Sequence, residues 1–328
     1  TSMSVSHWCI SGDDMFWRAS HPAQTRLAAY HRIGQSERQM NRDLENLASR
    51  SAPAVFVLLW STGFIGTKYA LSGAAPLTYL AIRMAVVVVL MALIVAIWRP
   101  KWPSLPGIGH SIVAAILVHG FYLGGTAVAI AHSVPVGLSA PIPGLQPILT
   151  STIANRWLGE RVTWPQWIGL GLGLVGVVLI LHGRPMTGEV GWGWLASGVS
   201  LVSITLGALY QKRFCGNIDW RSGNLVQYIA VVVFFAIGSL LFEDGSVDWS
   251  LEFVLAVAWL AVVLSIGSIG VLYWLIRHRG ATQVASFFYL VPAVTALMAF
   301  VLFGERLDLL SIFGIAVCAM AVLLVNRR

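Results

Sequence analysis

The sequence predicts an all-α polytopic membrane protein, with ten transmembrane helices arranged as two inverted five-helix repeats and both termini in the cytoplasm. Three observations lead to this expectation: the composition, a series of apolar segments of spanning length, and a motif that occurs twice. Of the 328 residues, 57% are hydrophobic and 11% are charged, whereas a soluble domain carries about 25% charged residues. This composition excludes a water-soluble globule.

Ten apolar segments follow the first fifty residues, each close to the roughly 20 residues that a helix needs to cross the hydrocarbon core. Proline, glycine or charged residues separate them. Their expected bounds are 52–70, 76–98, 107–131, 134–157, 164–182, 190–213, 222–242, 250–276, 281–303 and 307–326.

The chain is expected to have three regions: a polar tail over residues 1–50, a first five-helix repeat over 51–185 and a second repeat over 186–328. The tail lacks the uninterrupted apolar core of a signal peptide, so we expect a disordered segment or a weak surface helix. Met40, just ahead of the first span, is a candidate first residue of the native chain, which would leave residues 1–39 outside it.

The distribution of lysine and arginine predicts the orientation, because cytoplasmic loops carry an excess of both. With both termini inside, only Arg184 and Arg306 fall in outer loops. The inner loops and the C-terminus then hold eleven basic residues, namely Arg99, Lys101, Arg156, Arg161, Lys212, Arg213, Arg221, Arg277, Arg279, Arg327 and Arg328.

A motif repeats at a fixed offset, because residues 139–183 align with residues 284–328 without a gap. The matching positions include Pro147 and Pro292, Gly159-Glu160-Arg161 and Gly304-Glu305-Arg306, and Gly169 and Gly314. The charge pattern puts the first Gly-Glu-Arg corner inside and the second outside, so the second repeat is expected to be inverted in the bilayer. Many secondary transporters are built from inverted repeats around a central site.

Carboxylates are absent from the centres of the predicted spans. Five of the 14 lie in the tail, and the rest lie in loops or within a turn of a span end, namely Glu160, Glu189, Asp219, Glu243, Asp244, Asp248, Glu252, Glu305 and Asp308. A buried acid is a common device for proton or sodium coupling, so its absence argues against carboxylate-coupled antiport. It also removes the paired acids or metal ligands of an intramembrane hydrolase.

No metal, cofactor or nucleic-acid partner is expected. Cys9, Cys215 and Cys318 are too far apart in the chain to indicate a zinc site or a disulfide framework. The net charge of +7 comes from basic residues between apolar runs, which is the pattern of membrane orientation and not of a nucleic-acid surface.

Polar and aromatic side chains at span depth are candidates for a substrate site, since ionisable groups are costly in a membrane and are functional hypotheses by default. His119 lies near the middle of the third span, and Tyr122 shares its helix face. Trp60 and Phe64 form an aromatic stripe on the first span. The alternative is ordinary packing, with His119 hydrogen-bonded to a neighbouring helix.

Further candidates are Arg83, Gln146, Tyr273 and Trp274. Arg83 could meet an anionic or polar group of a substrate, pair with a carbonyl or extend toward the interface. Gln146 lies in a proline-rich stretch that cannot form a regular helical ladder, so its amide could face a ligand or another helix. Tyr273 and Trp274 add aromatic surface on the eighth span, where some rings must simply pack or face lipid.

Two prolines are candidate hinges, because Pro147 and Pro292 occupy equivalent positions in the two repeats. A hinge would let the repeats move against each other, whereas the alternative is a static kink.

The Gly-Glu-Arg corners, the prolines and Gly169 and Gly314, together with Leu59-Trp60-Ser61-Thr62-Gly63-Phe64, resemble the EamA-like branch of the drug/metabolite transporter superfamily. The resemblance covers residues 52–328. It implies export of small metabolites across a bacterial inner membrane, through a cavity lined mainly by the first, third, fourth, sixth, eighth and ninth spans. Within the branch, the chain is most similar to YddG-type aromatic amino-acid exporters.

The resulting hypothesis is a secondary transporter, not an enzyme, that exports aromatic and other neutral amino acids or related amphipathic metabolites by alternating access. Its partners would be a small-molecule substrate and the lipid bilayer, and it would be a monomer or a weak homodimer. The alternatives are a carrier of phosphorylated or nucleotide-linked substrates, an intramembrane enzyme, and a non-transporting receptor or scaffold.

Overall fold

The structure is a computed structural model that describes residues 39, 51–132, 134, 136, 142–157, 162–182, 190–278, 281–304 and 307–326. The predicted tail therefore lies outside the described residues, apart from Gln39. The chain divides into two compact units, Thr1–Ser51 and Ala52–Arg328, and the second is described below. Its described residues contain no named strand, only an isolated bridge between Ala74 and Val247. The all-helical prediction is confirmed for this part of the chain.

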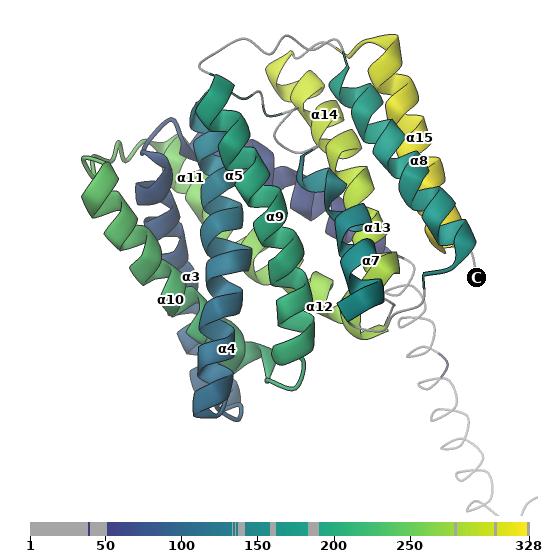
Figure 1. The fold of residues 1–328 in the computed structure, drawn as a ribbon. Coiled ribbons are helices and arrows are strands. Elements are labelled where there is room, and N and C mark those ends of the chain that lie inside the picture. The colour runs from purple at the N-terminus through teal and green to yellow at the C-terminus, as the bar shows by residue number, and fades with distance from the viewer. Residues whose placement is uncertain are drawn as a thin grey trace, which may run out of the picture. The chain divides into compact units, whose positions relative to one another are not determined.

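The first half starts with helical residues 51–70, and its further elements follow the predicted spans, except that the described helix of the predicted fourth span, 134–157, begins at Gln146. Pro76 begins α3 in the first turn, where a missing N–H costs nothing, and Arg99 ends it in the left-handed conformation with φ 44°. The further elements (Figure 1) are α3 (Pro76–Trp98), α4 (Leu105–Ala115), η2 (Ile116–Phe121), α5 (Tyr122–Ala131), η3 (Pro143–Leu145), α7 (Gln146–Trp157) and α8 (Trp164–Leu181).

The second half has the same succession of elements. Asp219 and Ser250 cap the helices α10 and α11 by accepting backbone N–H groups, and Gly304 ends α14 with φ 65°. The elements are α9 (Val190–Phe214), α10 (Trp220–Phe242), α11 (Leu251–Trp259), η4 (Leu260–Ser268), α12 (Ile269–His278), α13 (Ala281–Ser286), η5 (Phe287–Tyr289), α14 (Leu290–Phe303) and α15 (Leu309–Asn326).

Both halves carry the same two irregularities at matching positions. The segments η2 and η4 are π-helical and interrupt the long third helix of each half, while η3 and η5 are single 3₁₀ turns. Moving η2 along the chain by the repeat offset, from residue 139 to residue 284, places it inside η4. Segments of π-helix are rare and concentrate at functional sites. Their occurrence at equivalent positions indicates that this level of both halves is a candidate functional region.

The 3₁₀ turns explain how the predicted proline positions are accommodated. Pro147 is the second residue of α7, directly after η3, and Pro292 is the third residue of α14, directly after η5. In the first turn of a helix a proline removes no ladder hydrogen bond. Pro147 therefore lies in the first turn of a described helix, whereas Pro292 lies within the continuous helical stretch Gln283–Phe303, just after its 3₁₀ turn.

The helices α8 and α15 pack closely through small residues. A Cβ added at Gly176 would meet the carbonyl oxygen of Gly314 at 2.9 Å, and one added at Gly169 would meet the carbonyl oxygen of Ala321 at 3.1 Å. Later residues of α8 thus meet earlier residues of α15, so the two helices run antiparallel. Small residues at such interfaces let helix backbones approach each other.

Hydrogen bonds connect the two halves at one end of the helical body. The Glu243 carboxylate, just after α10, accepts the N–H groups of Leu77 and Thr78 at 2.8 and 2.7 Å and the Thr78 hydroxyl at 2.6 Å. Nearby, the N–H of Asp248 donates to the carbonyl of Gly73 at 2.7 Å. These bonds join the start of α3 to the end of α10.

Different contacts tie the opposite end. The hydroxyl of Ser222, at the start of α10, donates to the carbonyl of Lys101 at 2.7 Å. The Arg213 guanidinium at the end of α9 donates to the carbonyl of Trp157 at the end of α7 at 3.0 Å. The end of α7 therefore lies with the connection between α9 and α10.

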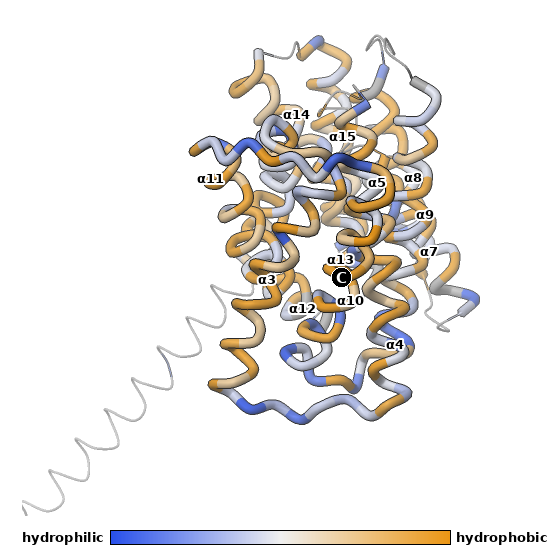
Figure 2. Tube along the Cα trace, turned by 90° about the vertical axis from the view of Figure 1, so that its left-hand side faces the viewer, coloured by the Kyte–Doolittle hydropathy of each residue, from blue (hydrophilic) through white to orange (hydrophobic). Residues whose placement is uncertain are grey.

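Seven described helical stretches are long and apolar enough to cross a membrane. They are Pro76–Trp98, Leu105–Ala131, Gly191–Phe214, Trp220–Phe242, Leu251–Leu272, Gln283–Phe303 and Leu309–Asn326, with a shorter apolar helix over Trp164–Ile180. Hydrophobic residues follow the helices, and hydrophilic residues are frequent at the connections (Figure 2). A polytopic membrane protein is confirmed, and the count of ten spans stays a prediction.

Candidate functional site

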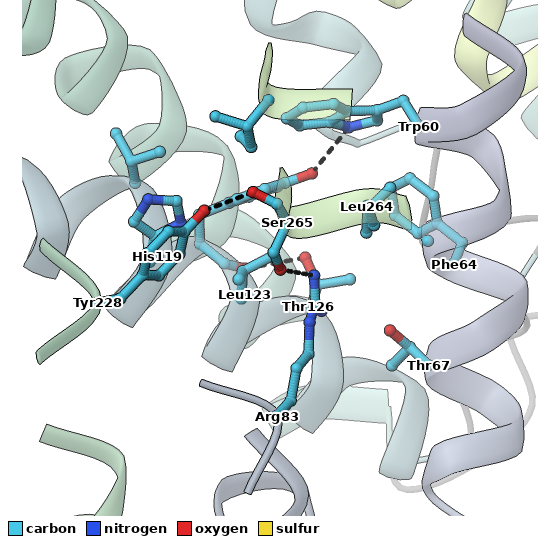
Figure 3. A pocket seen from close by; sticks show the side chains of 14 residues that line it. Trp60, Phe64, Thr67, Arg83, His119, Leu123, Thr126, Tyr228, Leu264 and Ser265 are labelled. Carbon is cyan, nitrogen blue, oxygen red and sulfur yellow. Dashed lines mark hydrogen bonds between the residues drawn. The ribbon is translucent and has the colours of Figure 1, made fainter. Parts of the chain in front are cut away.

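Two neighbouring cavities lie among the helices, and we name each after one of its residues. The Arg83 cavity encloses about 550 Å³ of empty space, including the part open to solvent. Its lining (Figure 3) comprises Trp60, Gly63, Phe64, Thr67, Arg83, Val118, His119, Tyr122, Leu123, Thr126, Tyr228, Leu264, Ser265 and Ile269.

The Gln146 cavity is larger, with about 1380 Å³ of empty space counted in the same way. It shares Trp60, Val118, His119 and Ile269 with the Arg83 cavity, so the two cavities meet at these side chains. From there its lining passes through Gln146, Thr150, Ile204, Ala208, Leu209, Asn224, Gln227, Leu272, Val284, Ala285 and Phe288 and reaches Ser111, Gln211, Lys212, Cys215, Gly216, Ile218, Asp219, Trp220 and Gly223.

Trp60 lines both cavities and is held by other aromatic side chains. Its Nε1–H donates to the Tyr122 hydroxyl at 3.3 Å. The Phe288 ring packs edge-on against it with centroids 5.2 Å apart, and Phe56 lies at the same distance. Such ring pairs favour tilted or edge-to-face geometry. The predicted first-span stripe therefore contributes two lining residues, since Phe64 also lines the Arg83 cavity.

His119 lies where the cavities meet, on the π-helical segment η2. Its side chain is buried, and its ring centroid is 5.0 Å from that of Tyr228. Tyr122 begins the following helix, and its backbone carbonyl accepts the hydroxyls of Thr126 and Ser200 at 2.9 Å each. The third span thus turns a polar strip toward the cavities, as its sequence spacing predicts.

Arg83 is a buried cation without a carboxylate partner in the described residues. Its side chain is 2% exposed, and its Nη2 donates to the Ser265 hydroxyl at 3.0 Å. Its Nε–H has no hydrogen-bond acceptor in the described part of the chain. By contrast, Arg221 forms an ion pair with Asp219, and neither residue lines the Arg83 cavity. In Figure 3 the Arg83 side chain extends toward Ser265 within the cavity lining.

Gln146 lies in the Gln146 cavity at the start of α7. Its side chain is buried, and its Oε1 has no hydrogen-bond donor among the residues that the structure describes; the hydroxyl of Thr150, one turn later, also has no partner among them. An unsatisfied buried polar group is costly, so two of them facing one cavity indicate a place where a ligand or water supplies the partners.

The aromatic pair predicted on the eighth span has a different outcome. The side chain of Tyr273 lies outside the described residues. Trp274 stacks on His278 with centroids 4.3 Å apart and is absent from the lining of both cavities. Trp274 is therefore placed beside the core, and its contact with a substrate stays a prediction.

The structure adds lining residues that the sequence analysis did not select. Asn224, Gln227 and Tyr228 on α10 face the cavities, and Gln227 donates to Gln211 at 3.0 Å. Their spacing of three and four residues on one span is the signal that would have found them. The second and seventh spans therefore also line the site, beyond the six spans that the family resemblance implied.

No carboxylate lines the Arg83 cavity among the described residues, and Asp219 is the acid that lines the Gln146 cavity, near its α9–α10 end. The part of the chain that the structure describes contains no group of three potential metal ligands. The lining is mostly apolar with a few polar groups, which is typical of a binding site for a small organic molecule.

Several apolar helices of spanning length around a central pair of cavities define a multi-pass membrane protein with a site for a small molecule. The chain belongs to the EamA-like transporter family, because the family model matches residues 53–182 and again residues 191–327. The chain is therefore a membrane transporter, and the resemblance stated from the sequence is confirmed. The same model matches once in each half of the body.

Curated relatives cover most of the chain at moderate identity. An "Uncharacterized inner membrane transporter YedA" of Escherichia coli K12 is 25% identical over 83% of this chain and 89% of its own length. An "Uncharacterized transporter YvbV" of Bacillus subtilis is 27% identical over 84% and 90%. A "Probable amino-acid metabolite efflux pump" of Escherichia coli K12 is 26% identical over 82% and 91%.

A solved crystal structure also has the same fold. It is 20% identical to this chain, covers 84% of it and 95% of its own chain, and gives a TM-score of 0.66. At this identity the likeness shows the fold alone.

Proposed function

We propose that the protein is a secondary transporter that exports aromatic and other neutral amino acids, or related small amphipathic metabolites, by alternating access. The observation that carries the proposal is the pair of cavities meeting at Trp60 and His119, with aromatic rings and neutral polar groups in their lining. Rings bind flat apolar side chains by stacking. Gln146 and the hydroxyls of Tyr122 and Thr126 would bind the polar part of the substrate.

The comparisons are compatible with this substrate class. The relative from Escherichia coli K12 with 26% identity carries amino-acid metabolite efflux in its name. The inner-membrane localisation predicted from the sequence agrees with the name of the YedA relative.

Inverted repeats over ten spans are part of the proposal, with both termini cytoplasmic. The antiparallel packing of α8 and α15 supports it, because these helices contain the equivalent residues Gly169 and Gly314. Contacts at the helix ends support it as well. Trp157, just before the first Gly-Glu-Arg corner, lies with Arg213, whereas Phe303, just before the second, lies under the Lys68 ammonium at 3.7 Å.

Alternating access would need the site to open toward each side in turn. The lining of the Gln146 cavity reaches Lys212 and Asp219 at the connection between α9 and α10. The lining of the Arg83 cavity ends at Thr67, and the bonds of Glu243 to α3 tie the helix ends on that side. The Gln146 cavity therefore lies toward the predicted cytoplasmic side, and the Arg83 cavity lies toward the opposite side.

Pro147 and Pro292 remain our candidate hinges. Each closely follows a short 3₁₀ turn, where the regular α-helical ladder changes to a tighter pattern, which is a natural place for bending. Because no acid lines the Arg83 cavity among the described residues, we propose facilitated diffusion, or coupling through His119, over carboxylate antiport.

Counterflow in liposomes tests the function. Purified protein is reconstituted with internal unlabelled amino acid, and uptake of labelled tryptophan, phenylalanine or threonine is measured. We expect uptake that falls at least tenfold in Trp60→Ala or His119→Ala, because about 1.4 kcal/mol of lost binding corresponds to a factor of ten.

Trp249→Ala and His132→Ala are matched controls, since both side chains are exposed and line neither cavity. They should retain wild-type uptake. If folded wild-type protein moves no amino acid, the proposal is lost. Counterflow of phosphorylated metabolites instead would favour the carrier of phosphorylated substrates.

A further inference from the structure

The charge inside the Arg83 cavity narrows the substrate class. We infer that Arg83 is the binding residue for a carboxylate of the transported molecule, so that the substrate enters the Arg83 cavity with its carboxylate first. The inference rests on the proposed function for the role of the cavity, and it adds a required chemical group. It distinguishes organic acids and amino acids from amines and uncharged amphiphiles.

Arg83 lacks a counter-charge in the described part of its cavity. A guanidinium stays protonated and carries five N–H donors, and a buried charge is stable only when it is paired or fully hydrogen-bonded. Arg83 is 2% exposed, yet its Nε–H has no acceptor and no described acid lines its cavity. The acids of the described chain lie at helix ends and in connections, outside this cavity.

The polar side chains around Arg83 are neutral and already take part in hydrogen bonds. Ser265 accepts from Arg83 Nη2 while its own hydroxyl donates to the carbonyl of Leu260 at 3.1 Å, and Tyr228 donates to the Ser265 carbonyl at 2.7 Å. The hydroxyls of Thr67 and Tyr79 are hydrogen-bonded to each other at 3.2 Å. Ser265 and the Tyr79 hydroxyl, which also interacts with Arg83, are neutral partners, so they position the guanidinium without neutralising it and the site still requires an anion.

The shape and charge of the site favour a carboxylate over a phosphate. Planar carboxylates accept two parallel N–H bonds from a guanidinium, including Nε–H. Arg83 is the cation in the described lining of its cavity, whereas a phosphate dianion would call for further cations. A carboxylate at Arg83 leaves the rest of the molecule directed toward Trp60 and His119, where the larger Gln146 cavity begins.

Binding of a matched series to the wild-type protein tests the inference without any substitution. The series is phenylalanine, phenylalanine amide, 3-phenylpropionate and phenethylamine, measured by calorimetry on purified protein in detergent. We expect phenylalanine and 3-phenylpropionate to bind about 30-fold or more tightly than phenylalanine amide and phenethylamine, which both lack a carboxylate. A difference of this size is expected when a buried charge pair loses one member.

Substitutions then locate the effect. In Arg83→Gln the preference for ligands with a carboxylate should fall to a few-fold. Arg83→Lys should keep part of the preference, because lysine keeps the positive charge but lacks the two parallel N–H donors of the guanidinium. Lys101→Gln removes an exposed cation outside both cavities and should leave the preference unchanged.

The outcomes separate this inference from the proposed function. Equal binding of phenylalanine and its amide to wild-type protein, or a preference that persists in Arg83→Gln, overturns the role of Arg83. Binding of no carboxylate at all does the same. Arg83-dependent binding of 3-phenylpropionate without any binding of phenylalanine supports the carboxylate site and removes amino acids from the proposed function.

Discussion

Glu243→Gln should weaken the tie between α3 and α10. The carboxylate accepts three hydrogen bonds of 2.6 to 2.8 Å from Leu77 and Thr78 at the start of α3. Glutamine keeps one oxygen but turns an NH₂ group toward one of the N–H donors. Hydrogen bonds to charged groups contribute about 1.5–3 kcal/mol, and a negative charge at a helix start adds about 0.3–1 kcal/mol. Because Glu243 is partly exposed, we expect a loss of about 2 kcal/mol in the free energy of unfolding.

Denaturant titration in detergent micelles measures this loss, with helicity as the signal. Asp244→Asn is the matched control, because Asp244 is exposed and its described bonds go to Ser246 in the same connection; its stability should stay close to that of wild type. Thr78→Val, combined with Glu243→Gln in a double-mutant cycle, should show a coupling of about 1 kcal/mol. A Glu243→Gln change below about 0.5 kcal/mol, or strict additivity in the cycle, would refute the reasoning.

Three further outcomes are expected. Gly314→Ala should destabilise the fold by about 1–3 kcal/mol, because its Cβ would lie 2.7 Å from the Gly176 carbonyl oxygen; Gly171→Ala has open space there and should be neutral or stabilising in the same denaturant titration. Tyr289→Phe removes a buried 3.0 Å hydrogen bond to a carbonyl of α8 and should cost about 1 kcal/mol in that titration; no loss would show that the bond does not contribute. Burial raises the pKa of the Cys215 thiol, so less thiolate forms at neutral pH and maleimide labelling, followed by mass spectrometry, should keep accelerating above the ordinary thiol range; a plateau near that range would contradict it.

The helix bounds followed from the sequence because hydropathy, proline and charge all change at the same places. The predicted span 76–98 coincides with α3, since Pro76 begins it and the chain turns at Arg99. The expected 307–326 begins two residues before α15, where Asp308 instead caps the helix by accepting the N–H of Ser311. Local chemistry decides these ends.

The site was predictable only in part. His119 and Trp60 stood out because polar or bulky aromatic residues are unusual at mid-span. Ser265 did not, because a serine within an apolar run gives no sign that η4 is π-helical or that Arg83 will reach it from another helix. Trp274 was selected for its ring alone, although His278 lies four residues later on the same helix face, where the two rings stack.

The α8–α15 contact has the form of a two-fold symmetric interface. Gly169 of α8 is equivalent to Gly314 of α15, and Gly176 is equivalent to Ala321; Gly176 meets Gly314 while Gly169 meets Ala321. Reciprocal contacts of this kind are those of a homodimer of identical chains. Joined in one polypeptide, the same contact no longer depends on protomer concentration. Each half is then free to differ from the other at the cavities, where one carries His119 and the other carries Leu264 at the equivalent position.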